Sequence, residues 1–584
     1  MDAAAGSTPT TESAPPPAAG PTAVAEDPLT LATAQPAADN VTETASVHEY
    51  TEDSDDDADS TVPVDIPTRP LWYVVVLALT IGGLQLSWSA EFSHGTPYLI
   101  SLGMPRALMS LTWAAGPLSG VIVQPLVGAL SDQCRSPYGR RRPFLVAGAA
   151  MTSVSLLAFA WSRDIVRVVT LGHAPSWLVQ AFAVLSVYFL DFSIGIVQAA
   201  GRAFIVDNVP VHQQQSANAW AAILTGVGNI IGFILGSLEL PRLFPFLGGT
   251  QFKGLAAFAV IALLGSVAVA CRYVCEQPLA ADEVAGSRMT LRQALSVSLR
   301  ANRRLSPQVR NVCRAEFFAW IGYFPMLYYV TTFVGGIYYH QTMAGREGLP
   351  PLSTPAEDAL WDEGTRLGSR ALLVYSIVSL ATNLVMPVLV KPSYAPNSKA
   401  WLTVARAWTL SHGVFVVLML STFFVRSVGQ ATVIVGLLGA VWAHALWAPY
   451  VLIAEDIAET KFDLAASAKY ETDPGIVMAV HNVYVSLPQV VSSVAISVLF
   501  FLLGPLVASR AALADATVYL FVLGGATAIV AAVVSLRVRA LGAAPASYDS
   551  LPDDAAPGLF VRPAPSLFDH EDGHHGDGDG DGDD

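Results

Sequence analysis

Two charged side chains in one apolar run, residues 176–205, are the strongest candidates for chemistry. Asp191 lies about 15 residues into the run, and Arg202 follows 11 residues later. Eleven helical steps of about 100° return to nearly the same face, three turns on, so both groups point to one side. About 16 Å of helix axis separates them, too far for an ion pair. A carboxylate without a cationic partner in an apolar layer favours its protonated form, so Asp191 could take up and release a proton.

Glu91 is a second carboxylate within an apolar run, 71–98. If the first and fourth runs are neighbours, Glu91 and Asp191 could share one proton. Two alternatives stay open: Asp191 as a structural carboxylate hydrogen-bonded to other helices, and Glu91 as a group in a wet outer vestibule. Four further acids lie close to the ends of their runs: Asp207, Glu316, Glu455 and Asp456. Most of them are predicted to be interfacial, and a gating role is the alternative for each.

The segment after the second apolar run, GALSDQCRSPYGRRRPFLVAG, combines an acid with three consecutive arginines. Asp132 at a helix end, facing Arg140, Arg141 and Arg142, would form a charge-assisted clamp. Such a clamp can hold two helices together in one state and release them in another, and Asp207 is a further gating candidate. Membrane topology alone would explain the arginines, but it would not require Asp132 at that spacing.

Aromatic and polar side chains within the runs are candidates for binding a sugar. Aromatic faces stack on the apolar C–H face of a sugar ring, whereas tryptophans at the lipid interface are the alternative interpretation. The aromatic candidates are Trp88 in the first run, Trp320 in the seventh, and Trp442 and His444 in the tenth. Asn229 is a polar candidate, set between glycines whose spacing predicts close helix packing.

These residues must be positioned by membrane-spanning helices. Of the 584 residues, 53% are hydrophobic and 14% are charged, and the mean hydropathy is +0.48. A helix needs roughly 20 apolar residues to cross a bilayer, and runs that do not alternate in polarity are not barrel strands. We count twelve such runs, which predict an all-α membrane protein with two six-helix halves: 71–98, 106–131, 143–161, 176–205, 214–238, 252–274, 312–339, 368–390, 401–425, 429–455, 476–504 and 515–539.

Charge divides the chain further. Residues 1–70 carry a net charge of −13 and residues 542–584 carry −10, so we predict two disordered acidic tails. The halves are predicted at 71–274 and 312–541, joined by a basic central loop, 275–311, that is either a linker or a short interfacial helix. With both termini in the cytoplasm, the even-numbered loops and helix-flanking tails hold 20 basic residues against 10 in the odd-numbered loops. This asymmetry favours that orientation.

Several function classes are excluded by pattern. The sequence has no HExxH, GxSxG or Walker A motif, so we predict no enzyme and no ATP-driven pump. Cys271 and Cys275 are spaced one helical turn apart but lack two further ligands, so neither a metal site nor a cofactor is predicted. The apolar composition argues against a nucleic-acid partner, and the lipid bilayer is the expected surrounding. The oligomeric state is not encoded, although a monomer is favoured.

Two six-helix halves and the D-x6-GRRRP segment resemble the major facilitator superfamily. More specifically, SDQCRSPYGRRRPF, LDFSIGIVQAAGRAFIVDNVPVHQQQSANAW, GLQLSWSAEFSHGTPYLISLG and GIVMAVHNVYVSLPQVVSS resemble the sucrose and α-glucoside proton symporters, among the glycoside-pentoside-hexuronide cation symporters. The fungal branch is most similar, and Glu91 departs from the plant pattern. The resemblance covers about 71–541.

The resemblance implies that Asp191 is the proton-coupling group and that Arg202 is needed for sucrose transport. The expected function is therefore proton-coupled symport of sucrose, or a related α-glucoside such as maltose, by alternating access between the halves. The plasma membrane is the favoured location, with the vacuolar membrane as the other candidate. The alternatives are a facilitative or organellar proton-coupled sugar transporter, and a non-transporting sugar sensor that uses its acidic tails.

Overall fold

The computed structural model describes residues 68–210, 213–276, 300–346, 352–390, 402–462, 464–507 and 509–538. These residues form twelve helical runs long and apolar enough to cross a membrane, and within them no strand occurs. Because lipid offers the backbone no hydrogen-bond partner, each apolar run closes its own hydrogen bonds as a helix. The predicted all-α, twelve-span architecture is confirmed.

The first six spans make one half and the last six make the other. The first half comprises α1 (Leu71–Ala90), a π-helical turn (Glu91–Gly95), α2 (Thr96–Ser101), α3 (Arg106–Thr112), α4 (Ala115–Asp132), α5 (Arg142–Ala160), α6 (Ser162–Val169), α7 (Ser176–Asn208), α8 (Gln214–Ser237), α9 (Leu240–Leu243) and α10 (Gln251–Tyr273). The second half comprises α12 (Pro307–Ala344), α13 (Thr354–Leu389), α14 (Val404–Ser421), α15 (Val428–Phe462), α16 (Leu464–Lys469), α17 (Pro474–Leu503) and α18 (Arg510–Ser535).

Local sequence sets where several helices begin. Five of them start directly after a residue whose side chain accepts a hydrogen bond from a backbone N–H of the first turn, which satisfies a group that the helix itself leaves unpaired. These residues are Thr250 before α10, Ser306 before α12, Thr403 before α14, Asp473 before α17 and Ser509 before α18.

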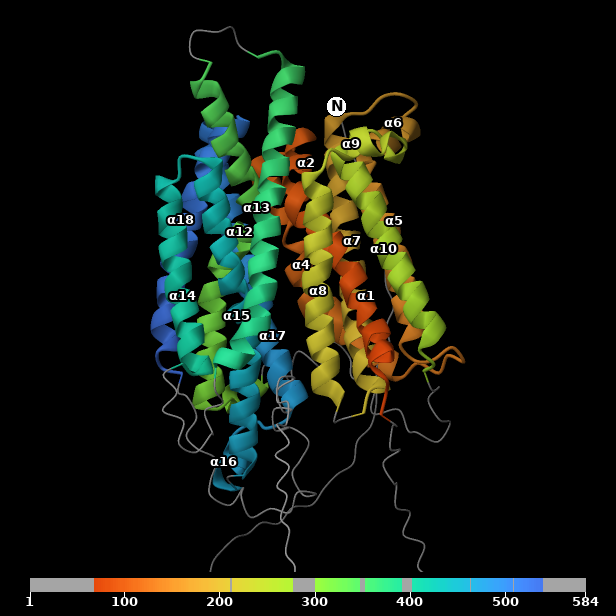
Figure 1. Ribbon diagram of the computed structural model, residues 1–584, viewed down its shortest axis with the longest axis vertical. Coiled ribbons are helices and arrows are strands. Elements are labelled where there is room, and N and C mark those ends of the chain that lie inside the picture. The colour runs from red at the N-terminus through yellow and green to blue at the C-terminus, as the bar shows by residue number, and fades with distance from the viewer. Residues whose placement is uncertain are drawn as a thin grey trace, which may run out of the picture. The chain divides into compact units, whose positions relative to one another are not determined.

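Figure 1 shows the two halves side by side, the first in red to yellow and the second in green to blue. In the first half, α1 packs on α8 and α10, and α7 packs on α4 and α5. In the second half, α12 packs on α18 and α13 packs on α15. The halves meet where α8 lies along α13 and where α17 lies against α3 and α4.

The first span differs from the continuous helix predicted over 71–98. Its α-helical ladder is interrupted by the π-helical turn at Glu91–Gly95, before α2 begins. Pro97 has no backbone N–H and its ring crowds the carbonyl four residues earlier, so the α-helical hydrogen bond to Ser93 cannot form, which favours an interruption here. Gly95 permits the close approach of Trp113 to this turn, because a Cβ there would lie 2.6 Å from the Trp113 ring.

Helix ends also differ from the predicted spans. α12 begins at Pro307, within the predicted central loop, and α13 begins at Thr354, well before the predicted 368. Hydropathy marks only the apolar part of a helix, and these two helices continue into polar sequence. The predicted interfacial helix between Leu291 and Leu299 lies outside the described residues, as do nearly all of the tails, 1–70 and 542–584.

Polar contacts that join the two halves gather toward one end of the bundle, which we call the loop 1–2 end because the turn at Gly103 lies there. Thr96 Oγ donates to the Tyr328 carbonyl oxygen at 2.6 Å, and Ser110 Oγ donates to the Ser493 carbonyl oxygen at 2.6 Å. Arg366 in α13 pairs with Glu239, before α9, at 3.3 Å. The halves are therefore held together at this end.

Candidate functional site

Two buried carboxylates meet near the middle of the first half. Glu91, in the π-helical turn, and Asp191, in α7, place their carboxyl groups within hydrogen-bonding reach of each other. Each residue is 1% exposed. The backbone N–H of Gly116 acts on Asp191, and among the described residues no basic side chain pairs with either carboxyl group. The structure thus brings together the two acids that the sequence selected.

Aromatic rings from both halves surround this pair. Trp88 stacks on Phe92 at 5.3 Å, and Trp113 stacks on Tyr328 of α12 at 4.7 Å between ring centroids. A Cβ atom at Gly116 would lie 3.6 Å from the Asp191 Oδ2, from the Tyr328 hydroxyl oxygen and from the Trp88 ring. The pair is therefore buried among aromatic rings, to which the second half contributes Tyr328.

The other predicted aromatic residues form a separate group in the second half. Trp320 and Trp442 contact edge to face at 5.5 Å, and Tyr323 lies 6.3 Å from Trp442. His444 is mostly buried, and its Nδ1 lies 2.8 Å from the Ala440 carbonyl oxygen. Trp88 lies instead beside the carboxylate pair, so the four predicted aromatic residues divide between two places.

Glu316 departs from the interfacial position predicted for it. Because α12 starts at Pro307, Glu316 lies more than two turns inside the helix and is 1% exposed. Trp320 Nε1 donates to its Oε2 at 2.6 Å, while its Oε1 has no partner among the described residues. The aromatic group around Trp320 and Trp442 thus contains a buried acid. Its position was predicted wrongly because the apolar run starts later than the helix.

Asn229 and Arg202 occupy different surroundings from each other. The Asn229 side-chain oxygen accepts from Gln85 Nε2 at 2.9 Å and from Ser89 Oγ at 3.0 Å, so it joins α8 to α1. Arg202 is exposed, and its charge acts on the hydroxyl of Tyr450 in α15, which is 43% exposed. Arg202 therefore faces the second half, whereas Asp191, three turns earlier, is buried.

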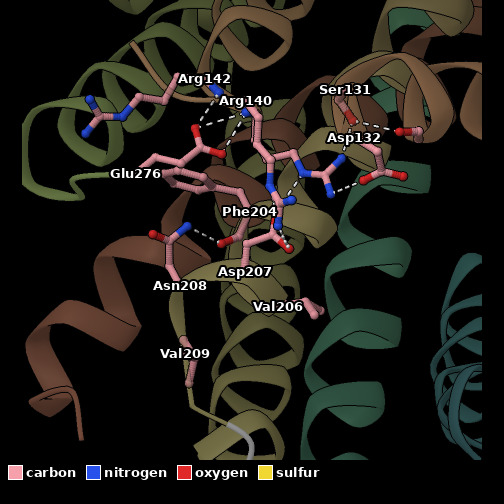
Figure 2. A network of polar contacts seen from close by, with 12 residues as sticks. Ser131, Asp132, Arg140, Arg142, Phe204, Val206, Asp207, Asn208, Val209 and Glu276 are labelled. Atoms are coloured by element: carbon pink, nitrogen blue, oxygen red, sulfur yellow. Dashed lines mark hydrogen bonds and ion pairs between the residues drawn. The ribbon is translucent and has the colours of Figure 1, made fainter. Parts of the chain in front are cut away.

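Asp132, Arg140, Arg141 and Asp207 form an ion-pair network, here called the arginine clamp (Figure 2). Arg140 Nη2 lies 2.9 Å from Asp207 Oδ1, and Arg141 Nε lies 2.7 Å from Asp207 Oδ2. Arg141 also donates to Asp132 and to Ser131 Oγ. Burial acts to lower the pKa of Arg141, but hydrogen bonds and charges from Asp207 and Asp132 outweigh it, so the pKa is raised. The clamp joins the ends of α4 and α7 to the start of α5.

Arg142 was predicted to belong to the clamp, but it does not. In Figure 2 its side chain extends away from Asp207, and within the part of the chain that the structure describes it enters no ion pair. Arg142 is the first residue of α5, and the helix turns its side chain to another side. It contributes a backbone N–H instead.

Glu276, which sequence analysis missed, organises this segment. Its carboxylate accepts from the Arg141 N–H at 2.7 and 2.9 Å and from the Arg142 N–H at 3.2 Å. A carboxylate on the free N–H groups of a helix start is stabilising. Gly139, at φ +105°, leaves the space, since a Cβ there would lie 2.2 Å from Glu276 Oε2. The sequence did offer a signal for this contact: Glu276 directly follows the sixth apolar run, and the GRRRP segment begins a helix whose first N–H groups need an acceptor.

Replacing Glu276 with Ala is expected to lower the free energy of unfolding by about 1–2 kcal/mol, the usual cost of losing a helix N-terminal acceptor. The change removes all three hydrogen bonds to the start of α5. Thermal unfolding of the purified full chain in detergent measures it. Glu459→Ala, at an exposed acid of α15, serves as the control and should leave the midpoint unchanged. Equal midpoints for both variants would contradict the role of Glu276.

No group of three or more His, Cys, Asp or Glu side chains that could hold a metal ion occurs in the described ranges. Cys271 is half-buried and Cys275 is exposed, and both are free thiols. The site is therefore described by its carboxylates, aromatic rings and arginines.

Comparison with known proteins assigns the fold to a family. Residues 74–468 match the Major Facilitator Superfamily. The general alpha-glucoside permease of Schizosaccharomyces pombe is 32% identical over 76% of this chain and 90% of its own length. Sucrose transport protein SUT3 of Oryza sativa subsp. japonica is 32% identical over 56% of this chain and 65% of its own length.

Among solved structures, the nucleoside transporter NupG superposes with a TM-score of 0.54 at 11% identity, covering 80% of this chain and 99% of that one. At that identity the likeness supports the fold alone. Together with the twelve spans and the two six-helix halves, the family match classifies the protein as a multi-pass membrane transporter and not an enzyme. The chain belongs to the Major Facilitator Superfamily.

Proposed function

We propose that the protein is a proton-coupled symporter of sucrose or a related α-glucoside such as maltose. The names of its relatives, a general alpha-glucoside permease and a sucrose transport protein, supply the substrate class. One observation carries the coupling: two adjacent carboxyl groups of the first half, Glu91 and Asp191, are buried without a basic partner among the described residues. Two adjacent negative charges in a buried site without a basic partner repel each other strongly, so the pair holds a proton whenever the site is closed.

The sugar site of this proposal lies between the halves, near the bilayer middle. Trp320 and Trp442 offer ring faces for the C–H surface of a sugar, and the free oxygen of Glu316 offers an acceptor for a hydroxyl. Arg202 faces the same region from the first half. A proton on the Glu91–Asp191 pair would favour sugar binding, and its release on the other side would weaken it.

The arginine clamp marks the cytoplasmic end in this proposal, which leaves both termini in the cytoplasm and the loop 1–2 end outside. The positive-inside distribution of Lys and Arg supports this orientation. The polar contacts between the halves gather at the loop 1–2 end. The conformation is then the one open toward the cytoplasm. We place the protein in a plasma membrane or a vacuolar membrane, with a monomer as the transporting unit.

The test is uptake of radiolabelled sucrose and maltose by the full chain in proteoliposomes, with and without an inward proton gradient. We expect concentrative uptake that a protonophore abolishes, and competition by other α-glucosides. Downhill uptake that ignores the gradient would indicate a facilitator. No uptake, together with saturable sugar binding, would indicate a sensor. Either result overturns the proposed coupling.

Trp442→Leu is expected to raise the KM for sugar about tenfold with a smaller change in maximal rate. Loss of one ring face removes on the order of 1 kcal/mol of stacking, in addition to apolar contact. Concentration series of sucrose uptake measure both constants. Trp177→Leu, at a tryptophan that is 69% exposed at the start of α7, is the matched control and should keep the wild-type KM. An unchanged KM in Trp442→Leu would remove Trp442 from the sugar site.

A further inference from the structure

Tyr328 is a residue of the second half whose hydroxyl approaches the carboxylate pair of the first half. It lies in α12, three residues after Pro325, and is 3% exposed. Its hydroxyl oxygen and the Asp191 Oδ2 both face the space at Gly116, each 3.6 Å from where a Cβ would be. The charges of both Glu91 and Asp191 act on this hydroxyl.

The first half holds the Tyr328 ring and backbone in place. Trp113 stacks on the ring at 4.7 Å and Phe92 meets it edge to face at 5.3 Å. Thr96 donates to the Tyr328 carbonyl oxygen at 2.6 Å. Phe92 lies in the π-helical turn, Thr96 begins α2 and Trp113 directly follows α3. The position of Tyr328 therefore depends on how the two halves contact each other.

The groups that face the pair are few, which makes the contribution of one hydroxyl large. Tyr188 of α7 is electrostatically coupled to Asp191, but its hydroxyl donates to the Leu111 carbonyl oxygen at 3.2 Å. Trp88, Phe92 and Trp113 carry no titratable group. In the described residues no arginine, lysine or histidine pairs with Glu91 or Asp191. The backbone N–H of Gly116 acts on Asp191, and the Tyr328 O–H is a side-chain donor from the second half placed to stabilise a negative charge there.

We propose that Tyr328 is a positioning residue for proton coupling: its hydroxyl donates to the ionised Glu91–Asp191 pair as the halves close, and so allows the empty, deprotonated carrier to change conformation. The inference rests on the proposed function. A carboxylate anion enclosed without a donor is costly, whereas a protonated pair can satisfy itself. The hydroxyl therefore matters when the pair carries charge, which is the return step of the empty carrier.

This assignment predicts a split between two transport modes. Net uptake requires the empty carrier to return, whereas exchange of labelled for unlabelled sugar uses only the loaded, protonated carrier. Tyr328→Phe keeps the ring that Trp113 and Phe92 contact and removes only the hydroxyl. A partner required only for stability would lower both modes together.

The experiment compares wild type, Tyr328→Phe and Tyr329→Phe in proteoliposomes with radiolabelled maltose. Tyr329 is the matched control, because it is 0% exposed and the groups that act on its hydroxyl are Ser110 and Arg106 rather than the carboxylate pair. For Tyr328→Phe we expect proton-driven net uptake to fall about tenfold while exchange stays within twofold of wild type. For Tyr329→Phe we expect neither mode to change.

Two results would overturn the role of Tyr328. One is net uptake and exchange falling by the same factor in Tyr328→Phe, and the other is net uptake unchanged. Failure of the proposed function is recognised separately, since wild type itself would then show no response to the proton gradient. Exchange activity also reports that Tyr328→Phe is folded and inserted.

Discussion

Asp191→Asn should abolish proton-driven accumulation of sugar, with a fall of at least about a hundredfold in the gradient-dependent rate. The amide has nearly the shape of the carboxyl group but cannot release a proton. Asp191 is 1% exposed, and its carboxyl group lies beside that of Glu91, with which it can share a proton. Losing the proton site should therefore remove the driving force without disturbing packing.

Exchange of labelled for unlabelled sugar decides how this result is interpreted. Asn can mimic the protonated carboxyl by donating a hydrogen bond, so exchange in Asp191→Asn should persist within a few fold. Glu91→Gln is the companion variant: Asp191 keeps its proton site, so we expect gradient-driven uptake to be reduced but present. Uptake by Asp191→Asn that remains gradient-driven would show that the proton is carried elsewhere, with Glu316 the next buried acid to test.

The sequence was sufficient for the global architecture because lipid imposes a strict rule. Each apolar run of adequate length must be a helix, and the runs are separated by polar loops, so the twelve spans could be counted directly. The same rule does not predict where a helix ends once it leaves the apolar layer. Glu316 lies near the start of its apolar run and was therefore predicted at an interface, although α12 begins at Pro307 and Glu316 is buried.

Pairwise geometry was predictable only where helical periodicity or helix order determined it. Glu91 and Asp191 could be paired because the first and fourth spans were expected to be neighbours. The π-helical turn that presents Glu91 results from Pro97 and from the close approach of Trp113, and the second of these is a tertiary contact. Glu276 and Tyr328 depend on contacts between residues more than a hundred positions apart, which periodicity does not encode.

The arginine clamp yields the second large effect: Arg141→Gln is expected to lower the free energy of unfolding by about 3 kcal/mol and the rate of uptake more than tenfold. Removing one partner of a buried ion pair is destabilising, and here it leaves Asp207 with Arg140 as its one remaining partner in the clamp. The Arg141 side chain is 6% exposed and bonds to Asp132, Asp207 and Ser131, so its loss separates the ends of α4 and α7. Thermal unfolding and maltose uptake measure the two losses.

Arg140 and Arg135 provide graded controls in the same loop. Arg140→Gln should cost much less, because the Arg140 side chain is 30% exposed and Asp207 keeps its bond to Arg141. Arg135→Gln, at an exposed residue, should match wild type. Equal losses in all three variants would mean that loop charge alone matters and not the bonds of Arg141.

A double-mutant cycle with Asp207→Asn tests whether the clamp acts as one unit. Residues in direct contact show non-additive effects, whereas independent sites add within about 0.5 kcal/mol. Because Arg141 Nε lies 2.7 Å from Asp207 Oδ2, the double variant should be scarcely less stable than Arg141→Gln alone, as the second change removes a charge already left without its closest partner. Additive losses would instead mean that Arg141 acts through Asp132 and Ser131, and that Asp207 is held by Arg140 alone.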